Sequence, residues 1–195
     1  CRRNSAVTCS LVCRWRSGHL TSFTQLATYA MASMRLSLAG VSYSLIQTPL
    51  GTCALGWTAV GVCWVGLPEL SLDRLRQRVH QRFQETREVG LSGESAAWAQ
   101  HISELTKGIA PRADHIPVDL DGVSAFYRRV YAAAQQIEFG QTSTYGDLAR
   151  QVGSPGAARA VGQALGRNPI PLIIPCHRIV GAGGKLGGFS AEGGV

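Results

Sequence analysis

Cys176 and His177 are the neighbouring residues of this chain whose types are best suited to chemistry. A thiolate is a good nucleophile, and an imidazole beside it can accept the thiol proton. Residues 170–174, before the pair, are apolar and bounded by prolines, which predicts a short buried strand or extended segment. The glycine-rich residues 181–188 could bring backbone close to a ligand. Free cysteines are often simply packed in a core, so the pair by itself leaves both interpretations open.

A short helix is expected upstream of the thiol, over residues 145–152. Residues 142–144 are of types that cap a helix, and Asp147 would lie in the first turn, where a negative charge is favourable. Gly153 is typical of a helix end. These signals predict the first helix of a pair.

A second short helix is expected over residues 156–166, with Ser154 and Pro155 as its cap and first position. The helical period would place Arg159 and Gln163 opposite an apolar face. Two short helices joined by a glycine-containing turn are typical of a DNA-binding helix-turn-helix, although ordinary helical packing produces the same pattern. The apolar face would consist of Ala157, Val161, Ala164 and Leu165.

Four short motifs occupy this part of the chain. They are Tyr-Gly-Asp-Leu-Ala at 145–149, Ala-Ala-Arg-Ala-Val-Gly at 157–162, Arg-Asn-Pro at 167–169 and Pro-Cys-His-Arg-Ile at 175–179. In order and spacing they resemble the methylated-DNA–protein-cysteine methyltransferases, the O6-alkylguanine-DNA alkyltransferase family. The resemblance is strong over residues 126–195 and weaker over residues 41–116.

The resemblance implies an α/β (α+β) fold with two domains. The first, residues 41–116, would be a small ribonuclease-H-like domain with an antiparallel sheet. The second, residues 117–195, would be a mostly helical, winged-helix-like domain that contains the helix-turn-helix and carries out DNA binding and alkyl transfer.

The reaction implied by the resemblance is DNA repair. An alkyl group on O6-alkylguanine, or on O4-alkylthymine, in double-stranded DNA would pass directly and stoichiometrically to Cys176, so that each protein molecule acts once. The target base would be flipped out of the duplex. Cys176 would be the nucleophile, His177 would take its proton through a water, and Tyr145 would donate towards the purine. No cofactor is implied.

The resemblance also implies residues that hold the DNA and the base. Arg159 would fill the gap left by the flipped base, and Asn168 would tie the recognition helix to the active-site segment. The DNA-binding set would be Ala158, Arg159, Gln163 and Asn168, and Ile179, Phe189 and Ser190 would form the substrate pocket.

The chain departs from the family pattern at its end. The family continues into a helix whose glutamate orients the histidine, whereas this sequence ends at Val195 and Glu192 does not match that glutamate. The second domain is therefore expected to be truncated at its C-terminal helix. A noncatalytic protein that binds alkylated DNA is the alternative on this ground. A thiol hydrolase and a plain helix-turn-helix regulator are further alternatives.

Basic charge is concentrated at the N-terminus. Of the formal net charge of +7, residues 1–40 contribute +5 through five arginines and no acidic residue, which leaves only +2 for the other residues. The overall charge is therefore weak evidence for a nucleic-acid partner, and arginines near the motifs are better evidence. These are Arg128, Arg129, Arg150, Arg159, Arg167 and Arg178.

Residues 1–40 show no clear period and are expected to be a disordered or non-native extension, either translated upstream sequence or a transit peptide. Beyond them, Cys53, Cys63 and Cys176 are too widely spaced for a disulfide framework or a zinc pair. No apolar run is long enough to span a membrane. The cysteine pattern favours an intracellular, reducing setting, so we expect the protein in the cytoplasm or nucleoid, or in the nucleus of a eukaryote. We expect no bound metal, and we expect a monomer.

Other elements are predicted from period and turn residues. Trp98 is expected to anchor the core. The scattered histidines His80, His101 and His115 are expected to have surface or core roles. The arginines at 74, 76 and 78 are expected to be solvated. The expected elements are an antiparallel meander of strands at 41–46, 52–57 and 60–65 with a turn at 48–51, helices at 70–88, 94–105 and 124–136, and a linker at 114–121.

Overall fold

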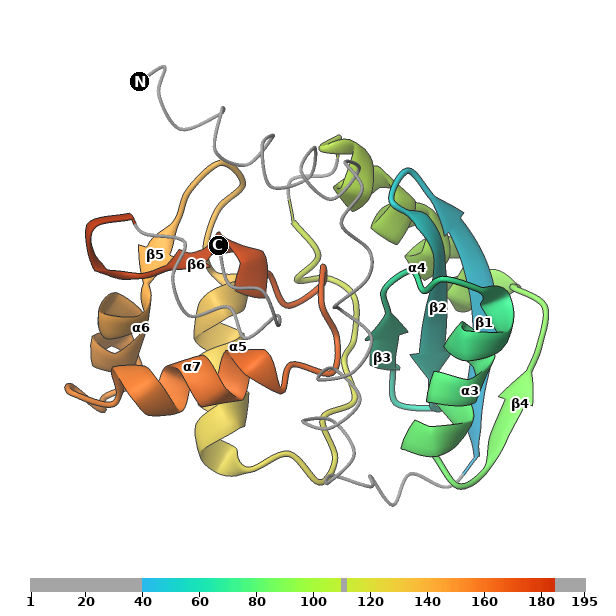
Figure 1. The fold of residues 1–195 in the computed structure, drawn as a ribbon, viewed down its shortest axis with the longest axis horizontal. Helices are drawn as coiled ribbons and strands as arrows, with labels where there is room; N and C mark the ends of the chain where they lie inside the picture. Colours follow the sequence, from blue (N-terminus) through green and yellow to red (C-terminus); the bar gives the residue numbers. More distant parts are fainter. Residues whose placement is uncertain (1–39, 110–111, 185–195) are drawn as a thin grey trace. The chain divides into compact units, whose positions relative to one another are not determined.

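The computed structural model describes residues 40–109 and 112–184 (Figure 1). The predictions for Phe189, Ser190 and residues 1–39 lie outside these ranges. The described residues form a mixed α/β structure. In chain order its elements are β1 (Val41–Thr48), β2 (Gly51–Trp57), β3 (Val62–Gly66), α3 (Leu72–Arg82), β4 (Thr86–Glu88), α4 (Gly93–Lys107), α5 (Ala125–Gln135), β5 (Ser143–Thr144), α6 (Tyr145–Gln151), α7 (Ala158–Gly166), η1 (Cys176–Arg178), β6 (Ile179–Val180) and η2 (Ala182–Gly184).

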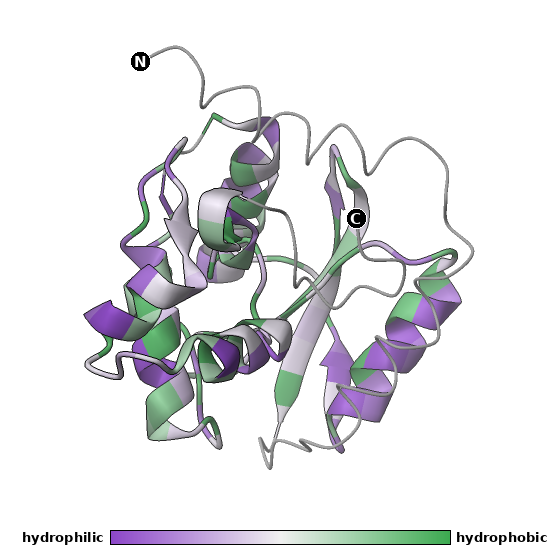
Figure 2. Cartoon of the chain, turned by 60° about the vertical axis from the view of Figure 1, so that its left-hand side comes forward, coloured by the Kyte–Doolittle hydropathy of each residue, from purple (hydrophilic) through white to green (hydrophobic). Residues whose placement is uncertain are grey.

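The described residues divide into two compact units. The first unit comprises residues 40–109 and 112–123 with residues 169–173, and the second comprises residues 124–168 with residues 174–184. Within the described ranges, no helix has the length and apolar character needed to cross a bilayer. Hydrophilic and hydrophobic positions lie side by side around the helices (Figure 2), as expected for helices with one face on a core and one in water.

A four-stranded sheet in the order β3-β2-β1-β4 forms the first unit. The predicted antiparallel meander of β1, β2 and β3 is confirmed. The fourth strand was not predicted: β4 pairs with β1 in parallel, Val41 opposite Thr86. The single helix expected over residues 70–88 is therefore wrong at its end, and so is the expectation of a purely antiparallel sheet.

Phe83 is the physical reason why the helix stops early. It follows α3 with extended backbone angles, φ −124° and ψ 144°, and its side chain is 2% exposed. The ring packs edge-to-face against Trp64, with 6.3 Å between centroids. Burying this aromatic side chain favours leaving the helix, which frees the next residues to pair with the open edge of β1.

Trp64, on β3, is the large aromatic residue of this core. It is 2% exposed and packs with residues of β1, β2 and α3 in one apolar cluster. Trp98, which was predicted to be the anchor, is only partly buried on α4. The prediction was wrong because helical period alone does not tell how deeply a face is covered. The cluster consists of Val41, Tyr43, Ala54, Cys63, Trp64, Leu75, Val79 and Phe83.

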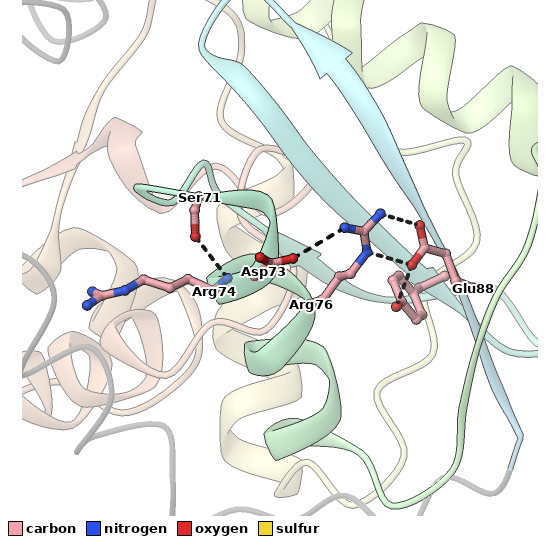
Figure 3. A network of polar contacts seen from close by, with 6 residues as sticks. Ser71, Asp73, Arg74, Arg76 and Glu88 are labelled. Carbon is pink, nitrogen blue, oxygen red and sulfur yellow. Dashed lines mark hydrogen bonds and ion pairs between the residues drawn. The ribbon is translucent and has the colours of Figure 1, made fainter.

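Ion pairs, rather than solvated charges, hold the outer face of α3 to the sheet (Figure 3). Arg76 donates from Nε to Glu88 on β4 at 2.8 Å and also lies 3.7 Å from Asp73. Tyr43 donates its hydroxyl to the same Glu88 carboxylate at 2.9 Å. The hydrogen bonds from Arg76 are the largest cause of a lowered pKa for Glu88. Of the three arginines predicted to be solvated, Arg76 and Arg78 are paired, the latter with Glu69.

Residues 114–121, predicted as a linker, are instead held against β3. Val118 forms an isolated parallel bridge with Val62, whose N–H donates to the carbonyl of Pro117 at 2.9 Å. Asp119 is buried, and its carboxylate accepts a hydrogen bond from Thr58 at 2.6 Å. A pattern of turn residues cannot reveal this pairing, because the partner strand is distant in sequence.

Gly61 allows this close approach, and we predict that Gly61→Ala lowers the free energy of unfolding. A Cβ at position 61 would lie 2.4 Å from the Pro117 carbonyl oxygen, and the backbone has φ +157°. A clash and backbone strain of this kind typically lower the free energy of unfolding by about 1–3 kcal/mol. Urea unfolding measures the loss. Gly90→Ala is the matched control, because nothing lies within 4 Å of its Cβ position. A loss no larger than that of the control would show that the loop adjusts freely.

Three mutually packed helices, α5, α6 and α7, form most of the second unit (Figure 1). The predicted start of α6 is confirmed: the Thr144 hydroxyl accepts from the N–H of Asp147 at 3.0 Å, and the Asp147 carboxylate accepts from the N–H of Thr144. Gly153 follows the helix with φ +71°, as predicted. The start of α7 was predicted wrongly. Its N-cap is Ala157, because residues 154–157 close a separate turn through a hydrogen bond from Ala157 to the Ser154 carbonyl.

The apolar face of α7 is confirmed by the burial of Val161, Ala164 and Leu165. The buried hydroxyl of Tyr131, on α5, donates to the carbonyl of Ala164 at 2.8 Å. Beside the helices, β5 and β6 form a parallel pair in which Ser143 lies opposite Ile179. This pair brings the start of α6 next to the segment that contains Cys176.

Candidate active site

The segment before Cys176 is buried as predicted, but it is not a strand. Ile170, Ile173 and Ile174 are each at most 2% exposed, yet the backbone turns at Leu172, whose φ is +76°. Prolines at positions 169, 171 and 175 explain the difference, because proline has no N–H to donate to a neighbouring strand. The apolar pattern therefore predicted burial correctly and conformation wrongly.

Cys176 begins a short 3-10 turn, η1, and is 8% exposed. Burial raises the pKa of its thiol above the ordinary value of 9.0. Hydrogen bonds from the Asn168 side chain and from the backbone N–H groups of Cys176 and His177 oppose this rise. These donors are placed to stabilise a thiolate once the proton leaves.

Asn168 connects the end of α7 with the active-site turn. It lies two residues after α7 and is 4% exposed. Its Nδ2 donates to the carbonyl of Ile174 at 2.9 Å, and its side chain also hydrogen-bonds to Cys176. The end of α7 and the thiol are therefore linked through the Asn168 side chain.

His177 carries a neutral imidazole at physiological pH. Burial lowers its pKa to about 4, and the positive charge of Arg178 adds to the effect. Among the described residues, none hydrogen-bonds to its ring. The pKa values of Cys176 and His177 together mean that the resting pair is a neutral thiol beside a neutral imidazole, with the proton on sulfur.

Tyr145, the first residue of α6, lies in the same neighbourhood. Burial raises the pKa of its hydroxyl, and the negative charge of a Cys176 thiolate raises it further. Its ring passes close to α7, since a Cβ added to Gly162 would lie 3.8 Å from the Tyr145 ring. The structure thus brings Tyr145, Asn168 and Cys176 together from three separate segments of the second unit.

Arg159 and Gln163 are exposed on α7, while Ala158 is partly buried. The other arginines near the motifs differ in their surroundings. Arg150 pairs with Asp147 on its own helix, and Arg167 donates to the Tyr127 hydroxyl at 3.3 Å. Arg159 therefore stands out as an exposed cation on the helix predicted to recognise DNA.

Arg178 was grouped with the arginines that could face DNA, and this prediction is wrong. The side chain is 7% exposed and donates to the carbonyl of Ile137 at 2.8 Å. Ile179, predicted to line the pocket, is buried and pairs with Ser143 across β5 and β6. The burial of Arg178 was missed because no local sequence signal distinguishes a buried arginine from an exposed one.

The other described cysteines are packing residues. Cys53 and Cys63 are free and fully buried on β2 and β3. Burial raises the pKa of Cys53, and burial together with the charge of Asp119 raises that of Cys63 to about 12. Of the predicted scattered histidines, His101 and His115 are in ring contact at 4.4 Å, but no group of three or more metal-ligating side chains occurs within residues 40–109 and 112–184.

Comparisons with known proteins agree with this site. Residues 125–195 match the family described as the DNA-binding domain of 6-O-methylguanine DNA methyltransferase. A methylated-DNA–protein-cysteine methyltransferase of Mycolicibacterium paratuberculosis is 37% identical over 150 residues, which cover 76% of this chain and 84% of the relative. One of Methanosarcina acetivorans is 50% identical over 149 residues, covering 76% of this chain and 89% of the relative.

A solved structure shows the same fold. The crystal structure of Mycobacterium tuberculosis OGT in complex with DNA superposes with a TM-score of 0.61 at 34% sequence identity, covering 75% of this chain and 83% of the other. Similarity at this level over most of the relatives' length, together with a buried thiol in the matched region, shows that this chain belongs to the methylated-DNA–protein-cysteine methyltransferase family.

Proposed function

We propose that this chain repairs DNA by moving a methyl or larger alkyl group from O6 of guanine, and from O4 of thymine, to the sulfur of Cys176. The observation that carries the proposal is the placement of one buried thiol beside both Asn168 and Tyr145 in the region that matches the family. The product is a thioether, so each protein molecule acts once. The partner is double-stranded DNA. A relative whose structure contains DNA supports this, and so does the match of residues 125–195 to a DNA-binding domain.

The atoms balance without a cofactor. The thiol proton passes to His177 through a water, and the sulfur attacks the saturated alkyl carbon. A carbon–sulfur bond forms as the bond from that carbon to O6 breaks, and the electron pair stays on guanine. Tyr145 donates a proton to the departing purine and regains one from His177. The net products are alkylated Cys176 and unmodified guanine.

The resting charges decide when the thiolate forms. The thiol pKa lies above 9.0 and the imidazole pKa at about 4, so proton transfer from Cys176 to His177 is uphill before substrate binds. Hydrogen bonds from Asn168 and the backbone reduce the cost. We infer that little thiolate is present until the base binds, so that this single-use nucleophile reacts only slowly with other electrophiles.

The base reaches Cys176 by flipping out of the duplex, at a cost of a few kcal/mol. Arg159 is exposed on α7 and carries the charge and length to fill the vacated stack, with Ala158 and Gln163 beside it. Asn168 holds this helix to the active-site turn. Ile179, Phe189 and Ser190 line the pocket for the base.

We further propose that the chain folds as two domains. The N-terminal domain is ribonuclease-H-like, and the C-terminal domain is winged-helix-like and performs DNA binding and alkyl transfer. The mixed four-stranded sheet supports the first. The packing of α6 on α7, with β5 and β6 beside them, supports the second. The protein acts as a monomer and away from membranes.

The test of this function is mass spectrometry of the protein after incubation with duplex DNA that contains O6-methylguanine. The expected result is a stable gain of one methylene on the peptide that contains Cys176, with unmodified guanine left in the DNA. Tight binding without a mass change would support a noncatalytic lesion-binding protein instead. Multiple turnovers with release of the alkyl group would support a hydrolase.

We predict that the free energy of unfolding falls in acid because the buried imidazole of His177 resists protonation in the folded protein. Its pKa falls from 6.5 in the unfolded chain to about 4 in the folded one. Stability from the neutral imidazole is therefore present above pH 6.5 and is lost as the pH falls towards 4. The loss is at most about 3 kcal/mol, and less to the extent that water reaches the ring. Urea unfolding at pH 7.5 and 4.5 measures it, and His177→Gln should lose less between these pH values. Equal losses in both proteins would contradict the lowered pKa.

A further inference from the structure

Arg178 is a buried cation whose position the reaction scheme leaves unexplained. The side chain is 7% exposed, and burial lowers its pKa from the ordinary value. No carboxylate among the described residues pairs with it, and its Nε has no hydrogen-bond partner there. Burying a guanidinium without a carboxylate is unfavourable unless other contacts compensate.

Among the described residues, the side-chain contacts of Arg178 lead to one loop. Its Nη1 donates to the carbonyl of Ile137 at 2.8 Å, and its guanidinium stacks over the ring of Phe139, 5.5 Å from the centroid. Ile137 and Phe139 lie between the end of α5 and β5. The loop continues through β5 directly into Tyr145, the first residue of α6. Arg178 therefore holds the loop that carries Tyr145.

Arg178 is also the last residue of η1, the turn that begins with Cys176. The next residue, Ile179, pairs with Ser143 across β6 and β5. The turn with the nucleophile and the segment with Tyr145 are thus joined twice, by the short strand pair and by the Arg178 side chain. Two strand residues on each side give little rigidity by themselves, because such a pair contains few hydrogen bonds.

We propose that Arg178 is a positioning residue: by clamping η1 to the Ile137–Phe139 loop, it sets the placement of the Cys176 sulfur relative to the Tyr145 hydroxyl. The inference rests on the proposed function, because it concerns protonation of the departing purine by Tyr145. The clamp acts within the protein and not on DNA, since the guanidinium is buried and bonded to backbone. Its charge has a second consequence, because it helps to keep His177 neutral.

Two reactions of Cys176 separate positioning from a merely structural role. Transfer from free O6-benzylguanine needs a proton on the leaving purine and needs no DNA. Alkylation by iodoacetamide expels iodide, which needs no proton. Arg178→Met removes the charge and the hydrogen bond while keeping a long apolar side chain. Proton donation is typically worth about 10²–10⁴-fold, so we expect transfer from O6-benzylguanine to slow by at least about tenfold. Loss of the Arg178 charge beside His177 affects ionisation of the thiol in both reactions alike, so alkylation by iodoacetamide should slow much less than transfer from O6-benzylguanine.

A double-mutant cycle with Tyr145→Phe tests whether Arg178 acts through that hydroxyl. If it does, Arg178→Met should slow transfer much less in the Tyr145→Phe background than in the wild type. Arg178→Lys, which retains the charge, should restore part of the rate. If Arg178→Met fails to fold, Phe139→Leu can replace it, because it weakens the same clamp at a residue that is 44% exposed. Phe139→Leu should slow transfer from O6-benzylguanine more than alkylation by iodoacetamide, with a smaller difference than for Arg178→Met. Arg76→Met controls for the loss of a hydrogen-bonded arginine in the first unit.

Three outcomes would overturn the inference. Equal slowing of both reactions would assign Arg178 to general stability, and additive effects with Tyr145→Phe would show that the two residues act independently. Full activity of Arg178→Met would show that the clamp is dispensable. In each of these cases the wild type still transfers the alkyl group, so the proposed function stands. A wild type that accepts no alkyl group from either substrate overturns the proposed function, and this inference with it.

Discussion

Replacing Cys176 with alanine should abolish methyl transfer completely, because the reaction ends on this sulfur. Duplex DNA containing O6-methylguanine would be incubated with Cys176→Ala, digested, and assayed for methylated peptides and for lesion remaining in the DNA. We expect no methylated peptide and no loss of lesion. Binding to the lesion should be largely retained, since the thiol reacts with the base and is not expected to hold it.

Cys53→Ala and Cys63→Ala are the matched controls. Both sulfurs are fully buried and have raised pKa values, so neither is expected to react. Each variant should transfer the methyl group at close to the wild-type rate, after allowance for any loss of folded protein. A methylated peptide containing either residue, or transfer that survives in Cys176→Ala, would remove the central assignment.

Arg159→Ala should slow repair of duplex DNA far more than reaction with free O6-benzylguanine. In the duplex the arginine offsets part of the cost of flipping, which is a few kcal/mol. Since each 1.4 kcal/mol or so is a factor of ten in rate, we expect a loss of about ten- to several-hundredfold. The free base has no stack to refill, so the rate with O6-benzylguanine should stay close to that of the wild type. Single-turnover measurements on both substrates give the two ratios.

Gln163→Ala is the control for this experiment. Gln163 is also exposed and lies one turn further along α7, but it carries no charge. Its replacement should weaken DNA binding modestly without the large difference between substrates. If Arg159→Ala reduced both rates equally, the arginine would be acting on the fold of the second unit instead of on the flipped base.

Local signals in the sequence determined much of the second unit. The hydroxyl and carboxylate of Thr144 and Asp147 start α6, and Gly153 follows its end, because capping and backbone freedom depend on residues only a few positions apart. The apolar face of α7 follows from helical spacing in the same way. The motif around Cys176 was recognisable because its residue types are adjacent in the chain. These properties need no information about distant partners.

Only the tertiary structure decided the features that depend on residues far apart in the chain. The burial of Phe83 ended the predicted helix early, and the residues after it pair with β1 as β4. The bridge between Val118 and Val62 holds the predicted linker against β3. Both pairings join segments that are distant in sequence. The pKa of about 4 for His177 arises mainly from burial, which cannot be read from residue types, and is lowered further by the charge of the adjacent Arg178. The position of Arg178 itself depends on a carbonyl 41 residues away. Sequence thus determined which groups could react, whereas burial and long-range contacts decided their charge and placement, because electrostatic environment is a property of the packed protein.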